Sequence, residues 1–276
     1  MGFRGMTRIG NKEFHWGERT YIMGILNVTP DSFSGDGLDG RPEVAIARAK
    51  EMVAQGADIL DIGGESTRPG AAPVSVEEEL RRVIPVLKQV ANEINIPISI
   101  DTYKSEVARQ ALDCGASMIN DVWGLKEDIG LASLAAERKV SIILMHNQKG
   151  AVYNNMMAEV LDSLRWSVTK AKEAGVTPEN IMIDPGIGFG KTVEHNLEIM
   201  RRLDEFSVPG YPLLLGTSRK SMIGKTLNLP ADQRLEGTAA TVAIGIAKGA
   251  DIVRVHDVGP MMRVVRMSDA IVRSGG

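Results

Sequence analysis

The sequence predicts an α/β fold, a (β/α)8 TIM barrel with a short N-terminal β-hairpin. Eight short apolar runs recur along the chain, and nearly every run ends in a polar or glycine-rich cluster. A strand that is buried on both faces reads as a continuous apolar run, and helix-like stretches separate these runs, as in repeated βα units. Such units close into a barrel whose active site lies at the C-terminal strand ends. The runs cover residues 21–27, 58–64, 97–101, 117–121, 141–147, 181–186, 212–220 and 251–257.

A hairpin precedes the first strand of the barrel. Residues 8–23 contain Gly-Asn and Trp-Gly-Glu turn signals between short apolar positions, which is typical of two antiparallel strands joined by a tight turn. We expect this hairpin to plug the bottom of the barrel. Because His15 and Trp16 belong to it, His15 is assigned no chemistry.

Helical patterns fill the intervals between the strands. The stretch 45–57 ends at a glycine, as a helix stop should, and 75–94 begins with Ser75 as a cap and an acidic first turn. No linker or low-complexity segment interrupts the alternation, so we predict one domain over residues 1–276. The other predicted helices cover 105–116, 131–139, 152–174, 192–206, 235–250 and 260–273.

Composition excludes several classes of function. The chain has 276 residues, the size of one barrel, and its net charge of −3 gives no reason to expect nucleic acid or a membrane as a partner. The single cysteine, Cys114, excludes an internal disulfide or a multi-cysteine metal site, and we expect it to be a small buried hydrophobe. No apolar run approaches the roughly 18 residues of a membrane span, and the N-terminus lacks the apolar core of a signal peptide, which predicts a cytoplasmic protein.

Two connections are longer than βα loops usually are. Residues 29–42 follow the first strand and 65–75 follow the second, so both lie on the predicted catalytic rim. Long loops in this position are often lids over an active site, and the alternative is a tolerated surface loop. Phe33, Arg68 and Pro69 within these loops favour a functional role.

Acidic and amide side chains end three of the predicted strands. Asp101 and Asp184 end the third and sixth strands, and Asn120 lies at the end of the fourth. A buried carboxylate needs hydrogen-bond donors. No basic residue ends strands three, four or six, so we expect the donors to come from a ligand, such as a flat heterocycle with N–H and amino groups. Metal binding by the two aspartates is the alternative, and the absence of a His₂-carboxylate set or a tight Asp cluster disfavours it.

Basic side chains end the last two strands, where many barrels build a phosphate site. Lys220 follows the seventh strand, while Arg254 and His256 end the eighth. Several independent cations at one rim favour an anion site. The alternative for Arg254 is an ion pair with Asp251 or Asp257.

Several other polar residues and glycines have structural explanations. The glycines within 184–191 lack the spacing of a dinucleotide-binding loop and predict a tight turn instead. Lys191 is expected to be solvated, His195 to lie on the surface, and Arg219 to be structural. For His146, at the end of the fifth strand, two readings stay open: it lines the pocket, or it is a structural histidine bonded to backbone.

The motifs together resemble a known family. MGILNVTPDSFS, DIGGESTRPGA, PISIDTYK, INDVWG, ILMHN, DPGIGFGK, LLGTSRKSMIG, EGTAATV and VRVHDV, in this order, are similar to the bacterial dihydropteroate synthases, which are pterin-binding TIM barrels. The resemblance covers about residues 20–258. It implies a transferase of folate biosynthesis that joins p-aminobenzoate to 6-hydroxymethyl-7,8-dihydropterin diphosphate, releasing diphosphate and 7,8-dihydropteroate.

The resemblance also implies roles for individual residues. The implied pterin contacts are Asp101, Asn120, Asp184, Lys220 and Arg254. The implied diphosphate contacts are Asn27, Arg254 and His256, with Asn27 also a ligand of Mg²⁺. The implied p-aminobenzoate contacts are Phe33, Thr67, Arg68, Pro69, Lys220 and Ser221. The residues implied in catalysis are Lys220, Arg254, His256, Asp36 and Arg68.

The implied reaction is dissociative: diphosphate leaves first, and the arylamine attacks the resulting pterin cation. The first loop departs from the family pattern, because it reads Ser-Gly-Asp-Gly at 34–37 where many members read Ser-Asp-Gly-Gly. Carried over to this chain, the resemblance implies Asp36 as the acidic side chain, one position later, and the departure leaves open whether it replaces the usual acid. The family resemblance further implies a homodimer. The many apolar residues of the last predicted helix would form its interface, or would equally well pack on the barrel.

Two rival functions remain at this point. One is a pterin-binding methyltransferase that acts on a corrinoid protein, and the other is a non-catalytic barrel that binds a pterin or phosphate. The Ser-Arg-Lys-Ser cations and the Thr-Arg-Pro-Gly loop favour the synthase over both rivals.

Overall fold

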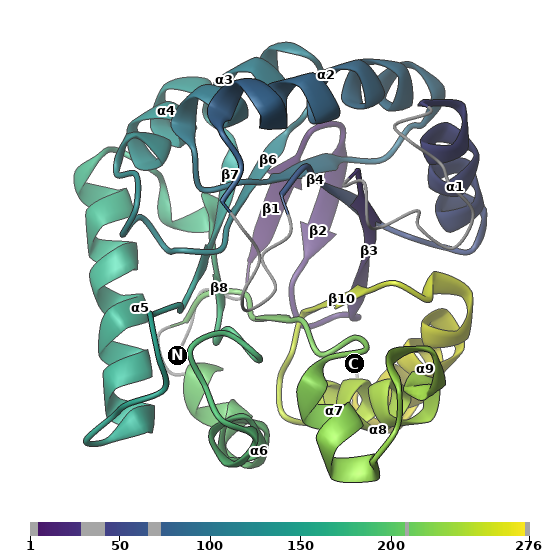
Figure 1. Cartoon of the computed structure of the whole chain (residues 1–276), viewed down its shortest axis with the longest axis vertical. Coiled ribbons are helices and arrows are strands. Elements are labelled where there is room, and N and C mark those ends of the chain that lie inside the picture. The colour runs from purple at the N-terminus through teal and green to yellow at the C-terminus, as the bar shows by residue number, and fades with distance from the viewer. Residues whose placement is uncertain (1–4, 29–41, 66–72, 208–209, 274–276) are drawn as a thin grey trace.

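A computed structural model describes residues 5–28, 42–65, 73–207 and 210–273. Within these ranges, eight parallel strands form one sheet in the order β8-β7-β6-β5-β4-β3-β10-β9 (Figure 1). The predicted TIM barrel is confirmed, and seven of the predicted strands match to within about two residues at each end. The strands are β3 (Tyr21–Asn27), β4 (Ile59–Gly63), β5 (Ile98–Asp101), β6 (Met118–Asp121), β7 (Ser141–Met145), β8 (Ile181–Asp184), β9 (Leu214–Leu215) and β10 (Ile252–Val255).

The barrel closes between β8 and β9. Ile183 bridges to Leu213 in parallel, and the Ile183 N–H donates to the carbonyl of Pro212 at 3.0 Å. The strand predicted over 212–220 is wrong in its second half, because the chain leaves the sheet after Leu215 and reaches Arg219 with a φ of 57°. An unexpected helix then begins at Ser221.

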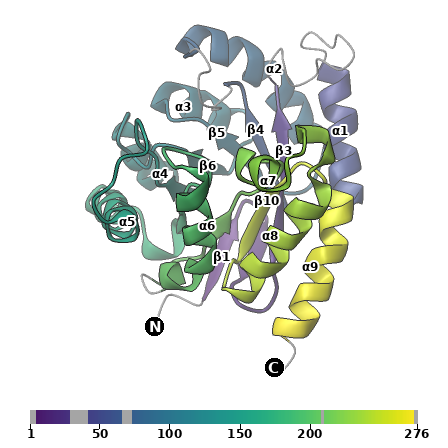
Figure 2. The same cartoon turned by 60° about the horizontal axis from the view of Figure 1, so that its bottom comes forward.

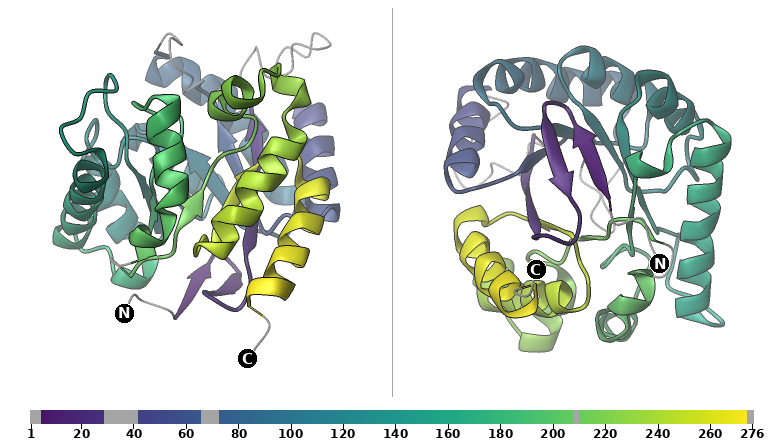
Figure 3. Two further views of the ribbon diagram at one scale, coloured as in Figure 1. Left: turned by 90° about the horizontal axis from the view of Figure 1, so that it is seen from below. Right: turned by 180° about the vertical axis from the view of Figure 1, so that it is seen from behind.

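Helices surround the barrel on its outer face (Figures 1 and 3). The Ser75 hydroxyl accepts the N–H of Glu78 at 3.2 Å, so the predicted cap of the second helix is confirmed. No helix in the described part of the chain is long and apolar enough to cross a membrane. The helices are α1 (Pro42–Ala54), α2 (Val76–Glu93), α3 (Ser105–Asp113), α4 (Gly130–Arg138), α5 (Met156–Glu173), α6 (Val193–Arg201), α7 (Ser221–Leu227), α8 (Leu235–Ala247) and α9 (Val258–Val272), with short 3-10 turns at Pro178–Asn180, Leu203–Ser207 and Ala231–Gln233.

The N-terminal hairpin plugs one end of the barrel, as predicted (Figure 3). Strands β1 (Met6–Ile9) and β2 (Lys12–His15) pair antiparallel. Phe14 and Trp16 pack into an apolar layer inside the barrel, and the Trp16 indole donates to Thr7 Oγ1 at 2.8 Å. The layer is completed by Ile9, Tyr21, Met23, Ile59, Met118, Ile143, Met182, Leu214 and Ile252. This end of the barrel is therefore closed by hydrophobic packing.

Strand alternation determines which side chains enter the barrel. On β4, Leu60 and Ile62 belong to the layer between sheet and helices, while Ile59 belongs to the layer inside the barrel. Because successive strand side chains point to opposite faces, Asp61 shares the inner face with Ile59. The inner positions therefore change from apolar near the hairpin to polar toward the C-terminal strand ends.

Candidate active site

Four buried polar side chains lie at the C-terminal end of the barrel. Asp61, Asp101, Asn120 and Asp184 are 0%, 7%, 3% and 6% exposed and come from β4, β5, β6 and β8. Asp101 and Asn120 are register partners on neighbouring strands. The structure thus brings together the three residues that the sequence selected, and it adds Asp61, which shares their inner face.

Arg254 joins these acids through its guanidinium group. Its Nε donates to Asp61 Oδ2 at 2.6 Å, and its Nη2 donates to Asp101 Oδ2 at 2.6 Å. Asn120 Nδ2 also donates to Asp61 Oδ2, at 3.0 Å. The expectation that a ligand must supply every donor is therefore wrong for Asp101. β10 joins β3, which joins β4, so barrel closure places Arg254 next to acids that are distant in the sequence.

The two alternative partners of Arg254 contact other groups. Asp257 is engaged by Arg219 in a two-pronged contact of 2.5 and 2.9 Å, which agrees with a structural role for Arg219. Asp251 accepts the backbone N–H of Leu213 at 3.0 Å.

Asp184 and Lys220 form the other half of the barrel mouth. Asp184 Oδ1 accepts the N–H of Gly186 at 2.7 Å. Lys220 Nζ donates to the Ile187 carbonyl and lies 4.2 Å from the centre of the Phe189 ring. Burial raises the pKa of Asp184, and the charge of Lys220 opposes that rise. Burial lowers the pKa of Lys220 to about 8, with Asp184 opposing.

Two carboxyl oxygens of the barrel mouth lack a hydrogen-bond donor among the described residues. Burial raises the pKa of Asp101 to about 7, against the charge of Arg254. Asp61 Oδ1 and Asp101 Oδ1 are buried and accept no hydrogen bond from any described residue. Buried acceptors of this kind suit a ligand that presents N–H groups.

Asn27 and His256 meet at the rim of the barrel. They line a cavity of about 250 Å³ together with Arg48 and Arg219. Ser218 Oγ accepts the His256 N–H at 3.1 Å and lies 2.9 Å from His256 Nδ1. The structure therefore brings together two of the three residues implied for diphosphate, while Arg254 contacts the acids within the barrel.

A magnesium site here would depend on the substrate. Among the described residues, no cluster of three or more His, Cys, Asp or Glu could hold a metal ion. The half-buried Asn27 offers one neutral amide oxygen. Mg²⁺ commonly takes one or two protein ligands and completes its shell with substrate phosphates and water, so a single Asn beside this cavity would fit that ion when a phosphate group of the substrate is bound there.

Five of the implied residues cannot be placed. Phe33, Asp36, Thr67, Arg68 and Pro69 lie outside the described residues. Two residues of the implied p-aminobenzoate site are described: Ser221 is the first residue of α7 and directly follows Lys220.

The structure corrects one expectation near Asp184. Lys191 is not solvated: its Nζ lies 2.7 Å from His146 Nδ1 and donates to the carbonyls of Gly186 and Phe189 at 3.0 Å each. His146 is 2% exposed, and burial lowers its pKa to about 2, so the imidazole is neutral. The His146 ring is bonded to the Lys191 side chain, where the structural reading had expected a bond to backbone. No periodicity in the sequence signals these contacts, because the acceptors are backbone carbonyls within a turn.

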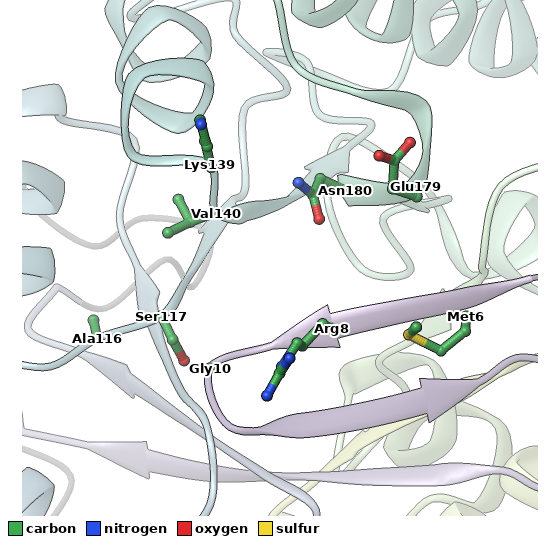
Figure 4. Close-up of a pocket in the computed structure, with 9 residues that line it drawn as sticks. All are labelled: Met6, Arg8, Gly10, Ala116, Ser117, Lys139, Val140, Glu179 and Asn180. Atoms are coloured by element: carbon green, nitrogen blue, oxygen red, sulfur yellow. The ribbon is translucent and has the colours of Figure 1, made fainter.

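A larger cavity, of about 550 Å³, lies at the opposite end of the barrel (Figure 4). Gly10 and Arg8 border it from the hairpin, and Ser117 and Asn180 border it from the starts of β6 and β8. None of the acids of the barrel mouth lines it, so the two sites are separate.

Comparisons with known proteins agree with this geometry. A family model described as "Pterin binding enzyme" matches residues 23–256. A dihydropteroate synthase of Clostridium beijerinckii is 56% identical over 267 residues, which cover 96% of this chain and 99% of that protein.

Solved structures give the same result. A dihydropteroate synthase from Clostridium difficile, crystallised in the presence of pteroic acid, has a TM-score of 0.92 and 55% identity, covering 95% of this chain and 100% of that one. The Xanthomonas albilineans dihydropteroate synthase with 4-aminobenzoic acid has a TM-score of 0.92 and 38% identity, covering 99% and 100%. On these matches and on the arrangement of its barrel mouth, the chain belongs to the pterin-binding enzymes and, within them, to the dihydropteroate synthases.

Proposed function

We propose that the chain catalyses the magnesium-dependent condensation of 6-hydroxymethyl-7,8-dihydropterin diphosphate with p-aminobenzoate, by a dissociative mechanism. The observation that carries this proposal is the barrel mouth itself, where Asp101, Asp184, Lys220 and Arg254 share one buried site. A dihydropterin has amino and N–H donors in its pyrimidinone ring, a further N–H in its reduced ring, and acceptors at its carbonyl and ring nitrogens, so it complements both kinds of side chain.

The pterin would bind between the acids and Lys220. Asp184 would accept the amino and ring N–H groups, and Asn120 and Asp101 would pair with the far edge of the ring. Lys220 would donate to the pterin carbonyl and ring nitrogen. The unpaired Asp101 Oδ1 supports this arrangement, because a ligand donor would satisfy it. Arg254 would flank the ring while remaining paired with Asp101.

The diphosphate would bind toward the rim. Asn27 and His256 line the cavity there, and Arg254 would reach the phosphates from within the barrel. When bound, Mg²⁺ would neutralise the charge of the leaving diphosphate, with Asn27 as its protein ligand. The cations of the rim favour departure of the anion because they lie where negative charge develops.

The proposed reaction uses the carboxylates deep in the barrel and the cations at its rim. The bond between the pterin methylene carbon and the diphosphate oxygen breaks, and its electron pair leaves with the diphosphate. The resulting cation is delocalised into the pterin and stabilised by the deep carboxylates. The neutral arylamine nitrogen then forms the new C–N bond and releases a proton to solvent or diphosphate, so a strong general base is not required.

The p-aminobenzoate site is a proposal from the family resemblance. Ser221 and Lys220 would form its described part, and the other contacts would come from the loops with Phe33, Thr67, Arg68 and Pro69. Closure of these loops would exclude water from the cation. Asp36 would add a negative charge from the first loop.

We also propose a homodimer and a cytoplasmic location. Helices α8 and α9 lie side by side (Figure 2) and expose large apolar side chains. Ile244 is 50% exposed, Met267 63% and Ile271 69%. Apolar groups at this density favour association between copies of the chain.

The proposed function is tested with the purified protein. We expect dihydropterin diphosphate, Mg²⁺ and p-aminobenzoate together to give dihydropteroate and diphosphate. When the amine is omitted, dihydropteroate should not form and diphosphate should be released more slowly. Diphosphate release without an amine-dependent product would reject the synthase reaction. A methyltransferase would instead bind methyltetrahydrofolate and transfer its methyl group.

A further inference from the structure

Lys191 lies behind the pterin-binding acid. It follows the turn 185–190, which connects β8 to α6, and its ammonium group has three hydrogen-bonding neighbours. Nζ donates to the carbonyls of Gly186 and Phe189 at 3.0 Å each and lies 2.7 Å from His146 Nδ1. An ammonium has three protons, so this set uses all of them within the protein.

The two carbonyls belong to residues that contact the pterin-binding groups. The Gly186 N–H donates to Asp184 Oδ1 at 2.7 Å. The ring of Phe189 lies 4.2 Å from Lys220 Nζ. One ammonium thus holds the residue that orients Asp184 and also the residue whose ring underlies Lys220.

His146 completes this arrangement from β7. Its backbone N–H donates to the carbonyl of Asp184 at 2.9 Å, while its neutral ring accepts from Lys191. Gly186 has a φ of +70°, and a Cβ there would lie 1.9 Å from the His146 carbonyl oxygen. The turn is therefore pressed against the end of β7, and Lys191 joins the two segments.

The charges near Lys191 are those of the pterin site. Burial lowers its pKa to about 7, Asp184 opposes this effect, and Lys220 and Lys126 reinforce it. In return, the charge of Lys191 lowers the pKa of Asp184, as do Lys220 and Arg254.

We propose that Lys191 is a positioning residue for the reaction: through the turn 185–190 it holds the carboxylate of Asp184 and the Phe189 ring beside Lys220 in the arrangement that binds the pterin. This inference rests on the proposed function and deepens it. Lys191 acts through Asp184 and Phe189 without contacting the pterin, so its effect should be largest on pterin binding.

The test compares Lys191→Met with Lys172→Met, whose side chain is exposed on α5 and has no ion pair or hydrogen bond with the described residues. Calorimetry with 6-hydroxymethyl-7,8-dihydropterin diphosphate, without p-aminobenzoate, gives the pterin Kd. We expect Lys191→Met to raise this Kd at least tenfold, and Lys172→Met to leave it within twofold. The KM for p-aminobenzoate, at saturating pterin, should change less than the pterin Kd in Lys191→Met, and less than twofold in Lys172→Met.

The pH dependence of pterin binding separates a positioning role of Lys191 from a purely stabilising one. Without the charge of Lys191, Asp184 should protonate at higher pH, so the acid limb of pterin binding should move upward in Lys191→Met. A lowered Tm with unchanged pterin Kd and unchanged acid limb, measured well below that Tm, would overturn the proposal. If Lys191→Met does not fold, Lys191→Gln is compared with Lys172→Gln by the same criteria. The expected rise in the pterin Kd is then smaller. Absence of pterin binding in the wild type and in both Lys172 controls would instead reject the proposed function.

Discussion

Replacing Arg254 by Met should destabilise the protein more than any change to an equally well-formed ion pair on the surface. Arg254 is 18% exposed and contacts two acids, Asp61 at 0% and Asp101 at 7% exposure, both at 2.6 Å. Removing one partner of a buried ion pair leaves an uncompensated charge and costs about 3–5 kcal/mol. For a chain of this size, that corresponds to a decrease in Tm of roughly 10 °C.

Arg219→Met is the matched control. Its contact with Asp257 is also two-pronged, at 2.5 and 2.9 Å, but the Arg219 side chain is 42% exposed. Exposed ion pairs contribute about 0–1 kcal/mol. Thermal unfolding followed by circular dichroism should therefore separate the two variants clearly, although the geometry of the two contacts is similar.

The loss of stability in Arg254→Met should also depend on pH. Arg254 lowers the pKa of Asp101 against burial, so its removal should raise that pKa above about 7. In the unfolded chain, the pKa of the Asp101 carboxyl is about 3.9, as in model peptides. The native wild type keeps the extra proton only up to about pH 7, whereas the native variant keeps it to higher pH, so the variant goes on losing stability as pH rises above about 7. We expect a larger deficit at pH 8 than at pH 5.5, and partial recovery in Arg254→Met/Asp101→Asn. Equal and pH-independent losses in Arg254→Met and Arg219→Met would refute the reasoning.

Three further predictions concern the pterin site and its turn. Asp184→Ala should weaken pterin binding by more than about 2 kcal/mol, because it leaves ligand donors buried without an acceptor; unchanged calorimetric affinity would remove Asp184 from the site. The kcat/KM for the pterin substrate should peak between about pH 7, where Asp101 ionises, and about pH 8, where Lys220 loses its proton; Lys220→Arg should move the alkaline limb upward, and an unmoved limb would assign it to another group. Gly186→Ala should lower Tm far more than Gly249→Ala: both have a positive φ, but an added Cβ meets a carbonyl oxygen at 1.9 Å at Gly186 and nothing within 4 Å at Gly249, so similar Tm values would contradict the packing of the turn.

The sequence predicted the fold well because its signals are local. Continuous apolar runs identified the barrel strands, and the Ser75 cap and the glycine stops gave helix ends. β9 was misjudged because the residues after Leu215 remain polar and small while the backbone turns toward α7. That change depends on the conformation of Arg219, which hydrophobic periodicity does not report.

The site was predicted less completely because its partners are distant in the sequence. The alternation on β4 places Asp61 on the same face as Ile59, a signal that was present but that did not identify its partner. The partner, Arg254, is 193 residues away and becomes a neighbour only when the barrel closes. Lys191 was missed for a different reason, since its acceptors are a histidine on another strand and two carbonyls of its own turn.

A crystal structure with bound pteroic acid tests the central claim most directly. The account predicts the pterin ring in the barrel mouth, with its amino edge on Asp184, its far edge on Asn120 and Asp101, and Lys220 at its carbonyl. The p-aminobenzoate portion should extend past Ser221. A pterin ring bound instead beside the hairpin, in the cavity lined by Arg8 and Asn180, would contradict the account.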